Sequence, residues 1–303
     1  MNGPGLHPMS VSPGAYRWYY ADVVAGDTTA VFIFMLGSLF SPRYAARARS
    51  GGRPVEHCAV NFALYRRGVR RQWVLSEYPG AKQSEAELRI GDSHLAYRDD
   101  GTVEFFVRAR TAPFGGVTKA FLKLTPEGPG LGDQLLVPGL SHRWAPLLLR
   151  ARATLRLPLL GLALEGHGYH DTNAGSEPLG TDLAGWTWAR VHGSAAPHVN
   201  YRRPAGAGLH VRGTDAEASV VRAPSARGAS TLTGWGLRVP RALEAGPERL
   251  GAPSLLESSP FYARLEAAAP GLHALGEVAD FRRFRSPLIR WMAHFRTRVE
   301  RAA

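Results

Sequence analysis

The sequence predicts an all-β protein made of antiparallel strands. Short apolar runs alternate with turn residues along most of its 303 residues, and the chain carries 34 glycines and 22 prolines. No long helical pattern separates these runs, as it would in a protein with a parallel sheet. Strands at this spacing are typical of antiparallel sandwiches and barrels.

The first group of strands is expected between residues 16 and 124. Asp99, Asp100 and Gly101 stand between two of the runs and are a strong hairpin signal. A stretch rich in Gly and Pro at 126–140 predicts a crossing loop, and a second strand-rich region follows from about Arg150. The expected strands cover residues 18–20, 29–36, 58–65, 73–75, 94–97, 103–107, 120–124, 153–164 and 187–191.

The length allows two ordinary domains, each with its own core. We expect a loose tail at 1–15, an N-terminal β domain at 16–165 and a C-terminal β domain at 166–303, with the boundary near Glu165. Cys58 is the only cysteine, so no internal disulfide can form.

The charge balance indicates an anionic partner. The formal net charge is +12, and only Lys82, Lys119 and Lys123 among the 37 basic residues are lysines. Such a surface is attracted to the phosphates of lipid or nucleic acid. The sequence has no zinc-finger, helix-turn-helix or RRM pattern, so we expect no nucleic-acid partner and a peripheral contact with an anionic membrane surface.

The sequence shows no spanning helix and no signal peptide. No run reaches the roughly 18 to 20 apolar residues that a spanning helix needs, and residues 1–14 lack a basic start. The expected location is the cytoplasm, with peripheral association with the inner membrane.

One amphipathic helix is expected near the C-terminus. Ser286 and Pro287 are typical of a helix start, and apolar residues then recur at helical spacing with arginines between them. The apolar positions are Leu288, Trp291, Met292, Phe295 and Val299. A basic amphipathic helix can lie in a membrane interface, or it can pack against its own barrel; both interpretations stay open.

The densest group of polar side chains lies at residues 167–173. In a strand, Tyr169 and Asp171 point the same way while His170 points to the opposite face. The same parity groups His142 with Trp144 upstream. The sequence therefore predicts a pocket that combines a carboxyl, an imidazole, a phenol and an indole.

These groups suit acid-catalysed chemistry on an alkene. Protonation of an unactivated C=C bond needs an acid in its neutral form, and burial raises the pKa of a carboxyl group. Aromatic faces stabilise the resulting carbocation, and a polar group must then position a water and accept its proton.

Each of these residues also has a plainer interpretation. His167 and His170 could ligate zinc, but no third ligand or Cys pair accompanies them, so no metal is expected. Asp171 and Asn173 could build a turn between the two halves. No phosphate-binding glycine loop occurs, so no nucleotide cofactor is expected.

Several segments resemble one family in order along the chain. They lie at 18–20, 34–42, 57–65, 142–146, 168–179, 186–190 and 259–262, and include Gly168-Tyr169-His170-Asp171-Thr172-Asn173. In these segments the chain resembles the carotenoid 1,2-hydratases, also called hydroxyneurosporene synthases. The likeness runs from about residue 16 to residue 300.

The resemblance implies a fold, an activity and a set of residues. It implies two lipocalin-like barrel domains and a cofactor-independent hydro-lyase that adds water to the terminal C1=C2 bond of acyclic carotenoids such as neurosporene and lycopene. The family's functional His, Trp, Tyr and Asp fall on His142, Trp144, Tyr169 and Asp171. The substrate-binding wall is expected to include Trp186, Trp188, His170, Asn173, Phe34 and Tyr65. Ala174 and Ser176 depart from the family pattern. We expect these two differences to affect which carotenoid is preferred more than the type of reaction.

We therefore expect Asp171 to protonate the alkene. Tyr169 and Trp144 would shield the cation, and His142 would orient the water and take its proton. Two alternatives remain: another cation-type or pericyclic transformation of a terpenoid or polyene, and a non-catalytic lipocalin-like carotenoid carrier.

Overall fold

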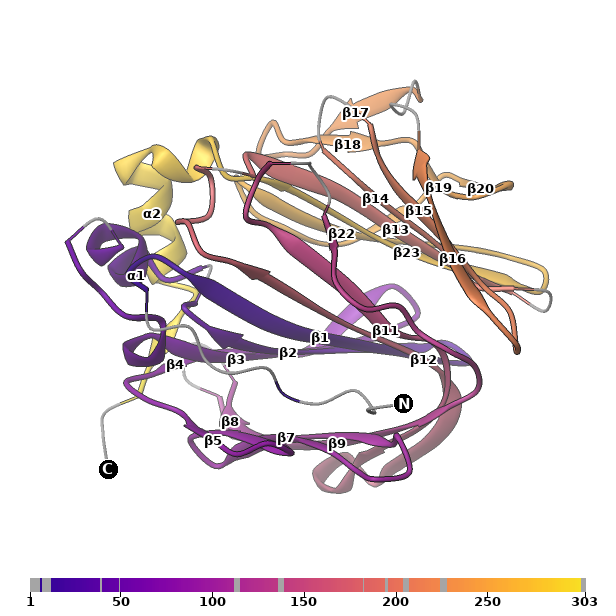
Figure 1. Cartoon of the computed structure of the whole chain (residues 1–303), viewed down its shortest axis with the longest axis horizontal. Coiled ribbons are helices and arrows are strands. Elements are labelled where there is room, and N and C mark those ends of the chain that lie inside the picture. The colour runs from indigo at the N-terminus through magenta and orange to yellow at the C-terminus, as the bar shows by residue number, and fades with distance from the viewer. Residues whose placement is uncertain are drawn as a thin grey trace.

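The computed structural model describes Leu6 and residues 12–38, 40–48, 50–111, 115–135, 139–181, 183–193, 196–203, 207–223 and 228–300. Its described part is built mostly of antiparallel strands in two large sheets, as the sequence predicted (Figure 1). The larger sheet curls into a half-barrel, and the second sheet lies over one of its faces.

The larger sheet has 13 strands. Their order is β24-β4-β3-β2-β1-β12-β11-β9-β8-β7-β6-β5, and β10 pairs with β11. The bounds are β1 (Tyr16–Ala25), β2 (Thr28–Leu36), β3 (Cys58–Arg66), β4 (Val69–Tyr78), β5 (Lys82–Gln83), β6 (Glu87–Ile90), β7 (Ser93–Tyr97), β8 (Val103–Arg110), β9 (Val117–Pro126), β10 (Gln134–Leu135), β11 (Arg143–Leu157), β12 (Leu162–Gly175) and β24 (Arg298–Val299).

The second sheet has seven strands in the order β16-β15-β14-β13-β23-β22-β21. The bounds are β13 (Gly185–Gly193), β14 (His198–Arg202), β15 (Gly208–Gly213), β16 (Ala218–Ala223), β21 (Ser254–Ser258), β22 (Tyr262–Ala269) and β23 (Leu272–Asp280). Two hairpins accompany it, β17 (Ser230–Leu232) with β18 (Arg238–Pro240) and β19 (Ala242–Ala245) with β20 (Glu248–Gly251). The helices are α1 (Pro42–Arg47) and α2 (Pro287–His294), with 3₁₀ turns at Pro54–Glu56, Pro158–Leu160 and Arg283–Arg285.

The period-two alternation of β1 and β2 supplies two separate cores. Tyr19 and Phe34 face the interior of the curled sheet, whereas Trp18, Tyr20 and Ile33 face the second sheet. Both faces of these strands are therefore buried, which explains why residues 29–36 read as a continuous apolar run. The core between the sheets positions the site described below.

The chain passes from the larger sheet to the second sheet between Gly175 and Gly185. Residue Glu165 lies inside β12, which pairs with β1 and β11 of the larger sheet. The second sheet begins only at Gly185, so the sheets separate after Gly175. The chain end also returns to the first part, because β24 pairs with β4.

Two expectations are corrected. Residues 153–164 form no single strand, because the Pro158–Leu160 turn separates β11 from β12. The C-terminal helix is confirmed but ends at His294, so Val299 belongs to β24 rather than to the helix. The expected hairpin is present, with Gly101 at φ +79° between β7 and β8.

Candidate active site

Asp171 lies on β12 and accepts three hydrogen bonds. Trp144 Nε1 donates to its Oδ2 at 2.9 Å and Tyr169 Oη to the same oxygen at 2.8 Å, while Asn173 Nδ2 donates to Oδ1 at 3.0 Å. The sequence brings these groups together in two ways. Tyr169, Asp171 and Asn173 share one face of β12, and the β11–β12 register places Trp144 opposite Asn173.

Burial raises the pKa of Asp171 to about 7, and the hydrogen bonds from Trp144 and Tyr169 act in the opposite direction. The carboxyl group is only 4% exposed, so desolvation of the charged form outweighs the donors. At neutral pH, Asp171 is therefore available in both its protonated and ionised forms.

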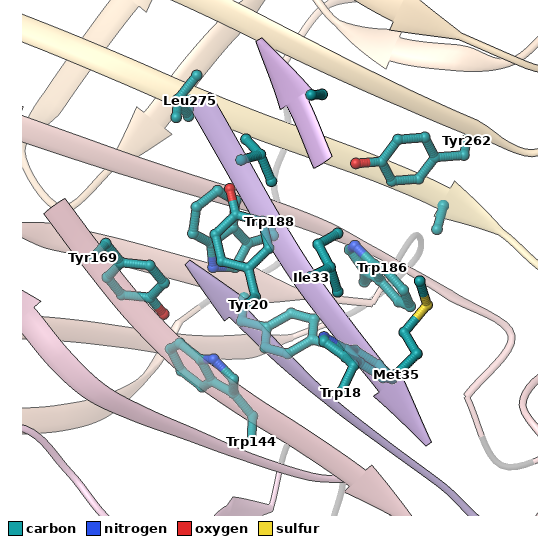
Figure 2. Packing of buried hydrophobic residues seen from close by; sticks show 14 of the residues in the cluster. Trp18, Tyr20, Ile33, Met35, Trp144, Tyr169, Trp186, Trp188, Tyr262 and Leu275 are labelled. Atoms are coloured by element: carbon teal, nitrogen blue, oxygen red, sulfur yellow. The ribbon is translucent and has the colours of Figure 1, made fainter. Parts of the chain in front are cut away.

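A small pocket of about 20 Å³ lies beside Asp171, between the two sheets. This volume is room for about one water molecule. Trp18, Tyr20, Asp171 and Asn173 line it from the larger sheet, and Trp186, Trp188, Tyr201 and Glu277 line it from the second sheet. Figure 2 shows Trp144 and Tyr169 on one side, with Tyr20 and Trp188 beside them.

The walls of this pocket are largely aromatic. Trp18 stacks on Trp186 with ring centroids 5.4 Å apart, and Tyr20 meets Trp188 edge to face at 5.5 Å. The hydroxyl of Tyr20 donates to Asp22, which forms a fully buried ion pair with Arg190 of β13. This ion pair joins the two sheets next to the site.

His142 is buried but is absent from the pocket lining. Its Nδ1 lies 2.8 Å from Tyr16 Oη and its Nε2 lies 2.9 Å from Tyr201 Oη. Tyr201 lines the pocket, and so does Trp18, whose ring centroid lies 5.7 Å from that of His142. His142 thus adjoins the pocket through Tyr201 and Trp18, and its expected role as the base stays a prediction.

The structure brings only part of the expected substrate wall together. Trp186, Trp188 and Asn173 line the pocket. His170 points to the opposite face of β12, where its Nε2 bonds Tyr97 Oη at 2.7 Å, and Phe34 packs in the core of the curled sheet. Both are thus separated from Asp171 by the sheet itself.

Tyr65 faces the second sheet but lies away from Asp171. Its hydroxyl donates to Glu257 at 2.8 Å and accepts from Arg264 at 2.9 Å. It therefore supports a second polar cluster, which also includes Glu277.

Sequence reasoning missed four residues that line the pocket. Trp18 and Tyr20 come from β1, Tyr201 from β14 and Glu277 from β23. The Trp18-Tyr19-Tyr20 run was among the family-like segments, which was one available signal. Nothing local marks Tyr201 or Glu277, because their approach to Asp171 depends on how the sheets pack.

An apolar cavity of about 340 Å³ lies further along the same gap between the sheets. Its walls continue those of the small pocket. On the larger sheet, Ile33 is the register partner of Tyr20 and Asn61 is the partner of Ile33. On the second sheet, Arg264 is the register partner of Glu277. Its outer part is lined by Trp235, Met292 and Phe295, next to α2. The family-like segment 259–262 also forms part of this wall.

The described part of the chain contains neither a membrane-spanning helix nor a cluster of metal-ligating side chains. None of its helices is both long and apolar enough to cross a membrane. No three His, Cys, Asp or Glu side chains there gather into a possible metal site. His167 and His170 point to opposite faces of β12, and His167 instead packs on His192.

Fold and site together define a class: a lipocalin-like, all-β protein whose two sheets enclose a buried carboxyl group among aromatic rings. Among solved structures, the fold is similar to that of a Nitrosomonas europaea protein described as AttH. The likeness has a TM-score of 0.59 at 12% identity and covers 88% of this chain and 92% of the other.

The chain belongs to the carotenoid hydratase family. A sequence model of that family, described as "Carotenoid hydratase CrtC", matches residues 32–303. The acyclic carotenoid 1,2-hydratase of Thiocapsa roseopersicina is 33% identical over 95% of this chain and 74% of its own length. Those of Rubrivivax gelatinosus and Cereibacter sphaeroides are each 31% identical, covering 88% and 85% of this chain and 68% and 94% of their own lengths.

Proposed function

We propose that this protein is an acyclic carotenoid 1,2-hydratase in which Asp171 is the acid. The observation that carries the proposal is a carboxyl group with a pKa of about 7, buried among aromatic rings in a family of carotenoid hydratases. Its neutral form can protonate C2 of the terminal double bond, which leaves a tertiary cation at C1.

The aromatic wall stabilises this cation. The rings of Tyr20, Trp186 and Trp188 line the pocket that Asp171 faces, and aromatic faces attract a desolvated cation by about 2 kcal/mol. Trp144 and Tyr169 bond Asp171 Oδ2, so they orient the carboxyl group and stabilise it once it has lost its proton.

A water is held between Asn173 of the larger sheet and Trp188 of the second sheet. Asn173 Oδ1 and Trp188 Nε1 are buried, have no hydrogen-bond partner among the described residues, and belong to side chains that line the pocket. They supply one acceptor and one donor for a single water. Capture of the cation by this water gives the 1-hydroxy product.

The polyene chain is assigned to the larger apolar cavity. An extended acyclic carotenoid is about as long as the roughly 30 Å hydrocarbon core of a bilayer, so a cavity of about 340 Å³ accepts only its terminal part. The pocket at Asp171 is smaller still, so the terminal isoprenyl group reaches the acid only when side chains between the two spaces move.

We also propose that the rest of the polyene stays in a membrane interface. Leu288, Trp291 and Phe295 of the α2 region are 62%, 59% and 61% exposed, and Trp235 at the cavity mouth is 50% exposed. Arg283, Arg285, Arg290 and Arg296 lie in or next to α2 in the chain and form no salt bridge within the described residues. Exposed aromatic rings beside arginines fit an anionic lipid surface.

The reaction is proposed to need no cofactor, because acid, cation-stabilising rings and water site are all protein groups. Dialysis of the purified enzyme against a metal chelator should leave its rate unchanged. A rate that is lost and restored by a divalent ion would refute this part.

The experiment that tests the function is expression in a host that makes lycopene, followed by analysis of the pigments. The proposal predicts 1-hydroxy and, if both ends react, 1,1'-dihydroxy derivatives. Unchanged lycopene bound to the protein would indicate a carrier. A cyclised product without added oxygen would indicate another cation reaction.

A further inference from the structure

Glu277 is a second buried carboxyl group in the same pocket as Asp171. It lies on β23 of the second sheet, whereas Asp171 lies on β12 of the larger sheet. Facing sheets pack about 10 Å apart, so the two carboxyl groups approach the pocket from opposite walls. Inverting glycosidases use such a pair of carboxyl groups, one as acid and one as base, when space for a water separates them.

The strand register fixes Glu277 in a row of functional side chains. Trp188 lies opposite Glu277 on one neighbouring strand, and Arg264 lies opposite it on the other. Tyr201 continues the row beyond Trp188. Glu277, Trp188 and Tyr201 all line the small pocket, so the carboxyl group is placed beside the proposed water site.

Arg264 is the cation that favours the ionised form of Glu277, against the burial that raises the pKa of this carboxyl group. Its Nε and Nη2 donate to the same carboxylate oxygen, Oε1, at 3.1 and 3.0 Å. Arg264 also lies 3.9 Å from Glu257, so one guanidinium faces two carboxylates. Asp171, by contrast, has no cation among its hydrogen-bond partners. Burial raises the pKa of both carboxyl groups, but only Glu277 has a cation bonded to it, and this difference in partners assigns Asp171 as acid and Glu277 as base.

Resting on the proposed hydration, we propose that Glu277 is the catalytic base that accepts the proton of the attacking water. Asp171 gives its proton to C2, and the C1=C2 electron pair forms the new C–H bond. The water oxygen then forms a bond to C1, and its extra proton passes to Glu277. A proton moves back from Glu277 to Asp171 through the next water, so both groups are restored.

With Glu277 as the base, no proton transfer to His142 is needed. His142 is bonded on both ring nitrogens by phenols, so it is a positioning residue for Tyr201. Glu277 reaches the pocket directly.

The test uses the purified full chain with lycopene in D₂O. In wild type, deuterium appears at C2 of the 1-hydroxy product. In Glu277→Gln, Asp171 still deuterates C2 but water capture slows by roughly 100-fold or more, the usual contribution of a general base. The cation then loses a proton from C2 or from a C1 methyl group, so recovered carotenoid or its double-bond isomer carries deuterium without added oxygen.

Three variants separate the possible outcomes. Asp171→Asn should give neither deuteration nor hydration. Glu277→Asp keeps the negative charge but moves the carboxyl group away from the pocket by one methylene. If Glu277→Gln fails to fold, Glu277→Asp should likewise give deuterated carotenoid with little 1-hydroxy product. Glu266→Gln changes a partly buried carboxyl group of the same sheet that contacts Thr29 and His273 outside the pocket, and should hydrate within about twofold of wild type.

Two results would overturn the assignment. One is hydration by folded Glu277→Gln at close to the wild-type rate. The other is a folded variant with neither label nor product, which would place Glu277 in the protonation step. If wild type itself makes no 1-hydroxy product, the proposed function fails instead.

Discussion

Trp144 and Asp171 are joined by a hydrogen bond of 2.9 Å from the indole Nε1 to the carboxylate Oδ2. Because this bond favours the ionised carboxylate, Trp144→Phe should raise the pKa of Asp171 further. The active form is the protonated acid, so the wild-type rate should fall as pH rises through about 7. In Trp144→Phe that fall should occur at higher pH, by on the order of one unit.

A pH–rate profile of kcat for both proteins checks this prediction. The Trp188→Phe variant is a suitable comparison, because it also removes an indole N–H from the pocket but no bond to Asp171. Identical alkaline limbs in wild type and Trp144→Phe would show that another group controls the rate.

Asp171 should also lower the stability of the folded protein. Its pKa is about 7 in the fold against 3.8 for the free side chain, so between these values the native state binds more protons than the unfolded state. Wild-type stability therefore falls as pH rises through this window and levels off above it. At pH 8, Asp171→Asn should increase the free energy of unfolding by on the order of 2 kcal/mol.

Urea unfolding at pH 4 and pH 8 measures this effect. The difference between variant and wild type should be small at pH 4 and larger at pH 8. A variant that is less stable than wild type at pH 8 would mean that the ionised carboxylate is well compensated by its three donors.

His142 should act through Tyr201. His142→Ala and Tyr201→Phe each break the 2.9 Å contact between the two residues, so each should reduce kcat by roughly tenfold or more. Because both changes remove the same interaction, the double variant should be little worse than either single one. If the fold-reduction of kcat in the double variant equals the product of the two single reductions, His142 has a role independent of Tyr201.

The α2 surface should control lipid binding rather than chemistry. Replacing Trp291 and Leu288 by Ser should weaken binding to vesicles that contain anionic lipid, since each buried ring or aliphatic side chain contributes about 1.5–3 kcal/mol. Hydration of detergent-solubilised lycopene should change much less. Replacing exposed Val69 and Val221 by Ser serves as the control, because these residues lie away from α2. Equal losses in both pairs of variants would contradict a specific lipid-binding face.

The part of the site on β11 and β12 could be predicted from the sequence, because the alternation of side chains along a strand determines which residues share a face. Tyr169, Asp171 and Asn173 share a strand face, and this parity follows from residue spacing alone. The same parity already placed His170 on the other face, and the structure keeps it there with Tyr97. Trp144 joined the group through its family-like segment, and the β11–β12 register explains the contact.

The rest of the site depends on tertiary packing. Glu277 and Tyr201 reach Asp171 only because a second sheet covers the first, and no local pattern encodes that distance. Packing also explains two glycines near the expected domain boundary. Gly166 and Gly168 lie within β12, where a Cβ on Gly168 would come within 2.3 Å of Leu124. These glycines serve close packing rather than chain flexibility.

The most direct test of the central claim compares wild type with Asp171→Asn for both lycopene binding and 1-hydroxylycopene formation. We expect the folded variant to bind lycopene with nearly unchanged affinity, measured by the shift of the pigment's absorption. We also expect product formation to fall by roughly 100-fold or more. Product formation by Asp171→Asn at close to the wild-type rate would contradict the assignment of Asp171 as the acid.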